Sequence, residues 1–133
     1  MKPTVLFVCV HNAGRSRIAE AYFNQMAGDR YLGISAGTQP ADRPHPEVVK
    51  ALQREGLEIP SGPGRLLTAE MAEGATRVIG MGCNVEEACP ALTVPLEDWG
   101  IDDPKGQPEA QVQAISRQIK EKVTALITEL DRA

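Results

Sequence analysis

The chain has 133 residues, a formal net charge of −4 and three cysteines. This length predicts one domain spanning residues 1–133. Fourteen basic against eighteen acidic residues, with one Trp, two Tyr and two Phe, argue against a nucleic-acid partner. With 42% hydrophobic residues but no long apolar run, the composition excludes disorder and a membrane span and indicates a soluble globular protein.

The N-terminus bears on where the protein works. The first ten residues, MKPTVLFVCV, lack the length and the small-residue cleavage site of a signal peptide, so we expect a cytoplasmic protein. Stable structural disulfides are rare in that reducing compartment, so the cysteines are expected to be catalytic, metal-binding or core residues. We expect a monomer that needs no cofactor.

Strands and helices are predicted to alternate along the chain. Continuous runs of β-forming residues mark the strands, and apolar residues at three- and four-residue steps mark the helices. In chain order we predict a strand over 4–10, a helix over 15–28, a strand over 31–36, a helix over 46–56, a short helix over 69–73, a strand over 76–81, a weaker strand over 92–96 and a long helix from 109 onward. Pro95 places the weaker strand at a sheet edge, and a loop is expected over 97–106.

This alternation predicts a three-layer α/β/α fold, in which helices cover both faces of a four-stranded parallel sheet. Function then belongs at the carboxyl ends of the strands. Cys9 and Cys83 both follow a predicted strand. The third strand neighbours the first in a doubly wound sheet, so Cys83 can lie near Cys9.

The loop after the first strand has the composition of an oxyanion site. Small residues at Ala13 and Gly14 let backbone N–H groups turn inward, and the start of a helix adds a positive dipole. Arg15 adds a planar guanidinium group, which can donate hydrogen bonds to two oxygens of a tetrahedral anion. The predicted oxyanion-binding residues are Val10, His11, Asn12, Ala13, Gly14 and Arg15.

The same loop predicts a nucleophile. A cysteine at a helix N-terminus or beside a cation is readily ionised, so we expect Cys9 to be a thiolate at neutral pH. Ser16 is placed to donate a hydrogen bond to that thiolate, and Asn12 to fix the loop through side-chain-to-backbone bonds. The alternative for Cys9 is a small buried hydrophobic residue.

The motif Cys-x5-Arg-Ser directly after VLFVC resembles the low-molecular-weight protein tyrosine phosphatase superfamily. Within it, CVHNAGRS is most similar to arsenate reductases, and the resemblance covers nearly the whole chain. It implies a phosphatase-like fold and an oxyanion substrate, with either arsenate reduction or phosphatase activity. A catalytically idle oxyanion- or metal-binding regulator is the alternative from another functional class.

The loop over 97–106 is expected to supply a general acid that protonates the leaving oxygen. The resemblance assigns this role to Asp103, which directly precedes a proline, with Asp102 as the second candidate and a solvated turn as the alternative for both. Phosphatases usually carry aromatic residues after this Asp-Pro, whereas here Lys105, Gly106 and Gln107 follow. The sequence therefore favours a small oxyanion, arsenate, over a phosphotyrosine ring.

Cys83 and Cys89 suggest redox chemistry, and the resemblance implies a disulfide relay from Cys9 to Cys83 and then to Cys89. The reductant in that family is usually thioredoxin, although some relatives use a low-molecular-weight thiol with a glutaredoxin-like partner. The Cys83–Cys89 spacing is one residue tighter than in the thioredoxin-coupled pattern. The alternatives are inert core residues or a zinc site with His11, for which the spacing matches poorly.

A weak potassium site is the one metal site that the resemblance implies. Asn12, Glu20 and Ser35 match positions that line such a site in some relatives, but the remaining acidic ligand has no evident match. The alternative for Glu20 is a solvated helix residue.

Overall fold

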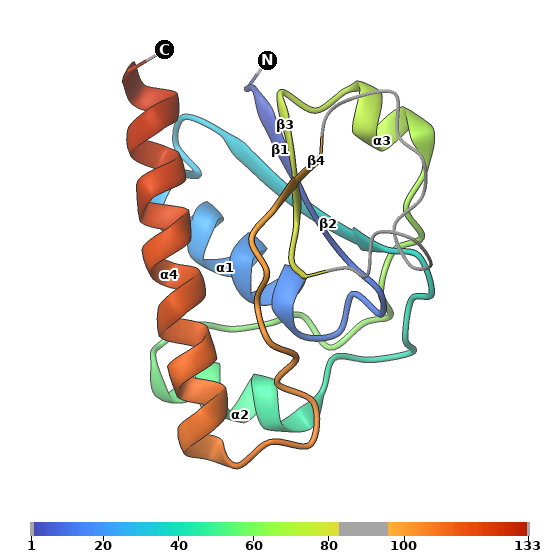
Figure 1. Ribbon diagram of the computed structural model, residues 1–133, viewed down its shortest axis with the longest axis vertical. Coiled ribbons are helices and arrows are strands. Elements are labelled where there is room, and N and C mark those ends of the chain that lie inside the picture. Colours follow the sequence, from blue (N-terminus) through green and yellow to red (C-terminus); the bar gives the residue numbers. More distant parts are fainter. Residues whose placement is uncertain (1, 83–95, 133) are drawn as a thin grey trace.

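The computed structural model describes residues 2–82 and 96–132. The elements in these ranges are β1 (Thr4–Cys9), α1 (Arg15–Ala27), β2 (Leu32–Gly37), α2 (Pro46–Arg54), α3 (Ala69–Glu73), β3 (Arg77–Gly80), β4 (Leu96–Asp98) and α4 (Glu109–Arg132) (Figure 1). The predicted elements up to β3 are confirmed to within two residues at each end, as is the start of the long last helix.

The four strands form one parallel sheet in the order β2-β1-β3-β4. Val8 of β1 pairs with Ala36 of β2 on one side and with Gly80 of β3 on the other. The carboxyl ends of the strands point away from the end of the molecule that carries both termini (Figure 1). Cys9, the last residue of β1, therefore emerges between the ends of β2 and β3, and the predicted fold class is confirmed.

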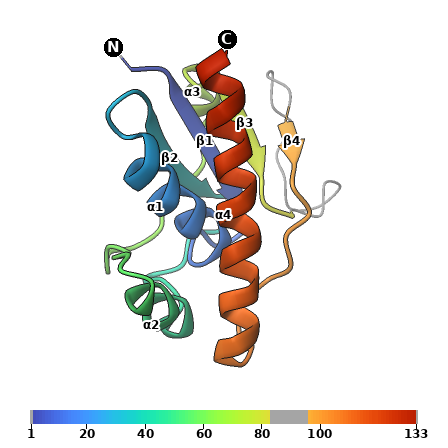
Figure 2. The ribbon, with the colours of Figure 1, turned by 90° about the vertical axis from the view of Figure 1, so that its left-hand side faces the viewer.

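The helices cover the two sheet faces unequally. Val5 and Phe7 of β1 pack with α1, α2 and α4 on one face, whereas Leu6 and Val8 face the smaller cluster that includes α3 (Figure 2). This alternation follows from the two-residue period of a strand. Phe7 packs edge-on against Phe23 of α1, with ring centroids 5.7 Å apart, so the strand that ends in Cys9 is fixed in the larger core.

The predicted end of the last strand was wrong. β4 covers Leu96–Asp98, so Glu97 and Asp98, which we expected in a loop, belong to the sheet, while residues 92–95 lie outside the described ranges. Arg77 of β3 explains the difference, because its Nε donates to Glu97 Oε2 at 2.8 Å and holds this acidic residue against the neighbouring strand. The predicted edge position is confirmed.

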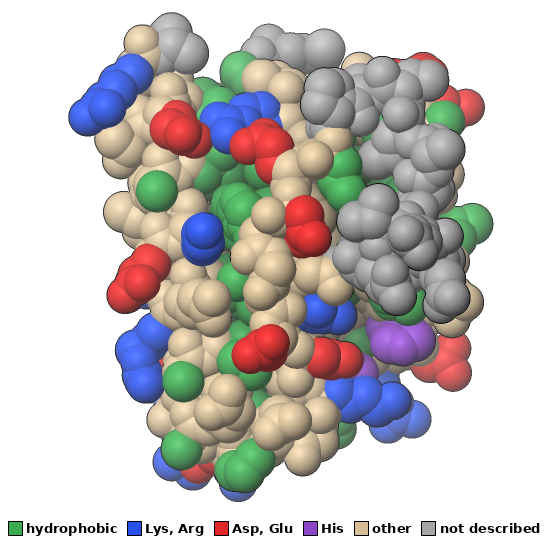
Figure 3. Space-filling model, viewed as in Figure 1, with side chains coloured by type: hydrophobic (Ala, Val, Ile, Leu, Met, Phe, Trp, Pro, Cys, Tyr) green, Lys and Arg blue, Asp and Glu red, His purple; other side chains and the backbone are tan. Residues whose placement is uncertain are grey.

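The surface carries mixed charge. On the face shown in Figure 3, acidic and basic side chains are interspersed, in keeping with the small net charge of −4. None of the helices within residues 2–82 and 96–132 has both the length and the apolar character needed to cross a membrane.

Candidate functional site

The predicted nucleophile lies at the carboxyl edge of the sheet. Cys9 is 3% exposed, and its Sγ lies 2.8 Å from Ser16 Oγ in the first turn of α1. The bond forms because the loop returns the chain to the end of β1, where the helix begins. The structure therefore places Ser16 where it can donate a hydrogen bond to a Cys9 thiolate.

The backbone of the following loop, residues 10–13, is turned outward at its carbonyl groups. Three of them accept hydrogen bonds of 2.8–2.9 Å from N–H groups of the segment 39–45. The pairs are Gln39 N with Val10 O, Ala41 N with His11 O, and His45 N with Ala13 O. In a trans peptide the C=O and the next N–H point in opposite directions, so the N–H groups that follow these carbonyls face away from the segment. That orientation suits an anion-binding loop.

Asn12 is the residue of this loop with a left-handed backbone, at φ 48°, and it is 2% exposed. Its Nδ2 donates to Ser16 Oγ at 2.7 Å, and its Oδ1 accepts from the backbone N–H of Arg65 at 3.0 Å. The expected side-chain-to-backbone bond is therefore present, and its partner is the N–H of Arg65 in the segment after α2. The positive φ turns its side chain toward the start of α1, where Ser16 is the available partner.

The guanidinium of Arg15 is anchored along one edge. Its Nη1 donates to Met81 O at 3.0 Å and to Ile101 O at 2.9 Å, which ties the loop to the ends of β3 and β4. Gly82 lies directly beside it, with φ 104°, and a Cβ at this position would come within 2.8 Å of Arg15 Nη1. Gly82 is the last described residue before Cys83, and both predicted relay cysteines, Cys83 and Cys89, fall outside the described ranges.

These groups converge on one pocket. Its lining residues are Cys9, His11, Ala13, Gly14, Arg15, His45 and Asp103. Asp102 is not among them, so the structure brings Asp103 rather than Asp102 to the pocket of Cys9. Asp103 Oδ1 accepts from the backbone N–H of Lys105 at 3.0 Å, which holds the carboxylate in a turn. His11 is fixed at the rim by its Nδ1, 3.1 Å from the carbonyl oxygen of Gln39.

Sequence reasoning did not identify His45 as part of the pocket. Burial lowers the pKa of its imidazole, and the charges of Glu47 and Asp103 partly oppose this shift. A mainly neutral imidazole therefore lines the Cys9 pocket near pH 7. Its position in the sequence could have indicated this. His45 directly precedes Pro46 at the start of α2, in a loop that begins at the sheet edge where β1 also ends.

The residues of the predicted potassium site also come together. Asn12, Glu20 and Ser35 line a pocket of about 80 Å³, but Arg17 and Arg65 line it as well. Arg65 Nη1 lies 3.9 Å from Glu20 Oε1, so the charged neighbour of Glu20 at this distance is basic rather than acidic. Burial raises the pKa of the Glu20 carboxyl, although Arg65 and Ser35 oppose the shift. Two guanidinium groups make this pocket less favourable for a cation than the three predicted residues alone.

Glu20 is also not a solvated helix residue, because its side chain is 21% exposed. Among residues 2–82 and 96–132, no group of three or more His, Cys, Asp or Glu side chains is arranged to hold a metal ion.

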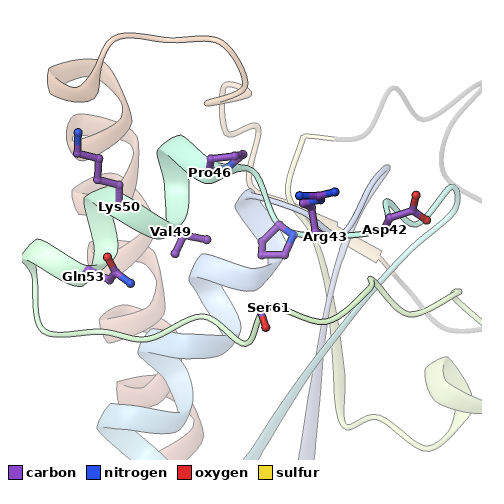
Figure 4. Close-up of a pocket in the computed structure, with 8 residues that line it drawn as sticks. Asp42, Arg43, Pro46, Val49, Lys50, Gln53 and Ser61 are labelled. Atoms are coloured by element: carbon purple, nitrogen blue, oxygen red, sulfur yellow. The ribbon is translucent and has the colours of Figure 1, made fainter.

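A third hollow, of about 530 Å³, lies beside α2 (Figure 4). It is lined by Asp42, Arg43, Pro44, Pro46, Val49, Lys50, Gln53 and Ser61. These residues come from α2, from the loop before it and from the segment after it. The hollow contains neither the thiol nor the anion-binding loop, so we assign the chemistry to the smaller pocket around Cys9.

Comparisons with known proteins identify the family of the chain. Residues 4–133 match the family model described as low molecular weight phosphotyrosine protein phosphatase. A putative arsenate reductase of Halobacterium salinarum is 36% identical over 130 residues, which cover 94% of this chain and 91% of that protein. Arsenate reductase 2 of Staphylococcus epidermidis is 28% identical over 129 residues, which cover 96% of this chain and 98% of that protein.

A solved structure extends the similarity to three dimensions. The thioredoxin-dependent arsenate reductase Cg_ArsC1' of Corynebacterium glutamicum superposes with a TM-score of 0.80 at 34% sequence identity, over 98% of this chain. The match spans 62% of that longer protein. These similarities confirm the resemblance carried by the Cys-x5-Arg-Ser motif after β1. The chain belongs to the low molecular weight phosphotyrosine protein phosphatase family.

Proposed function

We propose that this protein reduces arsenate to arsenite in the reducing cytoplasm. The observation that carries the proposal is the pocket in which Cys9, hydrogen-bonded to Ser16, faces the anion-binding loop together with Asp103. Among the described residues no Phe, Tyr or Trp lines this pocket, which favours a small oxyanion over an aryl phosphate. The similarity to proteins named as arsenate reductases supports the same choice.

In the first step the Cys9 thiolate attacks arsenic(V), an S–As bond forms and an As–O bond breaks. The Asp103 carboxyl donates its proton to the departing oxygen, which leaves as water. Arg15, held at Nη1, presents its other edge to the arsenate oxygens, and the loop N–H groups share their negative charge. The product is a covalent adduct in which arsenic is still pentavalent.

The second step needs a further thiol, and we assign it to Cys83. Its thiolate attacks Cys9 Sγ, a disulfide forms, and the S–As bond breaks with its electron pair on arsenic, which leaves as arsenite. Cys89 then attacks Cys83 Sγ and releases the Cys9 thiolate. Two described features support this assignment: β1 and β3 are neighbours, and Gly82 lies against Arg15.

The resulting Cys83–Cys89 disulfide must be reduced by an external dithiol for each new turnover. The similarity to a thioredoxin-dependent arsenate reductase supports thioredoxin as this reductant. A low-molecular-weight thiol with a glutaredoxin-like protein is the competing reductant, and the two are separated by supplying each in turn.

The relay is tested by removing its last thiol. Cys89→Ser is expected to release one arsenite per enzyme and then stop, whereas Cys83→Ser stalls at the arsenic adduct. Mass spectrometry after one equivalent of arsenate should find a Cys83–Cys89 disulfide in the parent and a Cys9–Cys83 disulfide in Cys89→Ser. Both variants should hydrolyse p-nitrophenyl phosphate at the parent rate, since the anion site is unchanged. Multiple turnover by Cys89→Ser with thioredoxin would refute the relay.

A further inference from the structure

Arg17 is buried directly behind the anion-binding loop, and the chemistry proposed above does not use it. The residue is 6% exposed although it lies in the first turns of α1. Its guanidinium donates from all three of its nitrogens to backbone carbonyls. Nε bonds to Asn12 O, Nη1 to Pro60 O at 2.9 Å and Nη2 to Gly62 O at 2.8 Å.

These bonds join two segments that are far apart in the sequence. The Nε bond holds the carbonyl of Asn12, in the middle of the anion-binding loop, and the two Nη bonds hold the segment 60–62. A single planar group thus fixes the distance between the loop and this segment. A lysine could not do the same, because its ammonium is one point on a flexible stem.

The bond to Asn12 O also sets the direction of one loop N–H group. In the trans peptide between Asn12 and Ala13, the Ala13 N–H points opposite to the Asn12 carbonyl. Because Arg17 holds that carbonyl, the Ala13 N–H is directed away from Arg17, and Ala13 lines the Cys9 pocket. We propose that Arg17 is a positioning residue that keeps this N–H group oriented toward the bound oxyanion.

The electrostatic surroundings support the same role. Burial lowers the pKa of the Arg17 guanidinium, so the charged group is held in this place at a cost. The negative charges of Glu20 and of a Cys9 thiolate oppose that shift.

The inference uses the oxyanion site of the proposed function but not its redox chemistry. Binding of inorganic phosphate therefore tests it separately, and remains informative if arsenate is not reduced. We compare the parent with Arg17→Ala and Arg17→Lys by calorimetric titration of phosphate. Arg65→Ala is the matched control, because it removes the other guanidinium that lines the pocket around Glu20. The backbone N–H of residue 65 can still donate to Asn12 Oδ1 in this variant.

Arg17→Ala is expected to raise the Kd for phosphate about tenfold or more, since a hydrogen bond to a charged group is lost. The KM for arsenate should rise in parallel, with a smaller change in kcat at saturating arsenate. Millimolar guanidinium chloride should restore part of the affinity of Arg17→Ala. Arg65→Ala should bind phosphate within about twofold of the parent and gain nothing from guanidinium.

Arg17→Lys keeps the charge and most of the side-chain volume, so it serves if the alanine variant does not fold. It is expected to fold and still to bind phosphate about threefold or more weakly, because one ammonium cannot hold both segments. Phosphate affinity within twofold of the parent in a folded Arg17 variant would overturn the proposal and leave Arg17 with a role in stability alone.

Discussion

Removing the Ser16 hydroxyl tests whether the loop is built around the nucleophile. Ser16→Ala deletes the partner of Cys9 Sγ at 2.8 Å and also leaves the buried Nδ2 of Asn12 without its acceptor. An orphaned buried donor costs about 1–3 kcal/mol, so we expect the free energy of unfolding to fall by about that amount. Loss of the bond to the thiolate should also lower the fraction of Cys9 that is ionised, although a less stabilised thiolate is intrinsically more reactive. The net result expected is that iodoacetamide alkylates Cys9 at least about threefold more slowly at pH 7.

The control is a second buried serine with a similar bond. Ser116 is 1% exposed and its Oγ lies 2.9 Å from the hydroxyl oxygen of Tyr22, so Ser116→Ala should cost a comparable free energy of unfolding. Stability is measured by urea denaturation, and the alkylation of Cys9 by mass spectrometry of its peptide. Equal alkylation rates in the parent, Ser16→Ala and Ser116→Ala would refute the reasoning, because Ser16 would then be a structural residue only.

Three further predictions follow from the same geometry. Asp103→Asn should lower arsenate turnover by roughly 10²–10⁴-fold and Asp102→Asn by much less; the reverse order would move the general acid by one residue. Gly37→Ala should disrupt the loop, because a Cβ there would lie 2.5–2.9 Å from backbone atoms of residues 9–12. We expect weaker phosphate binding and a free energy of unfolding lower by about 1–3 kcal/mol. An unchanged phosphate Kd would contradict this. Burial lowers the pKa of His45, so on acidification the imidazole is protonated in the unfolded chain before it is protonated in the folded protein, and stability is lost as the pH falls through 6.5. His45→Asn should flatten this part of a plot of Tm against pH. An unchanged slope would exclude His45 as the cause.

The sequence could predict the features that depend on local order along the chain. Cys9 and Arg15 are joined by a short loop between a buried strand and a helix, so the pattern of residue types indicates both their proximity and their chemistry. The order of strands and helices likewise predicts the parallel sheet, because few connections between such elements are compatible with right-handed crossovers.

The features that the sequence did not predict depend on contacts between distant segments. In the sequence, nothing distinguishes Arg17 from an ordinary helix residue. Only the fold shows that the segment 60–62 supplies two of the carbonyl groups that accept its hydrogen bonds. His45 lies 36 positions after Cys9, on a loop whose path is set by hydrogen bonds to the anion-binding loop. The extent of β4 depends in the same way on Arg77, which pairs with Glu97 across two strands.

The three hydrogen bonds between the segment 39–45 and the anion-binding loop give the molecule internal reporters. The amides of Gln39, Ala41 and His45 donate to three carbonyls of this loop. The N–H of each of these peptide groups points to the opposite side, where we propose that the oxyanion binds. A ligand that polarises one side of a peptide group strengthens the acceptor on the other, because consecutive hydrogen bonds reinforce one another. The amide resonances of these three residues should therefore shift when an oxyanion binds. NMR can then follow occupancy of the site without any turnover of the three thiols.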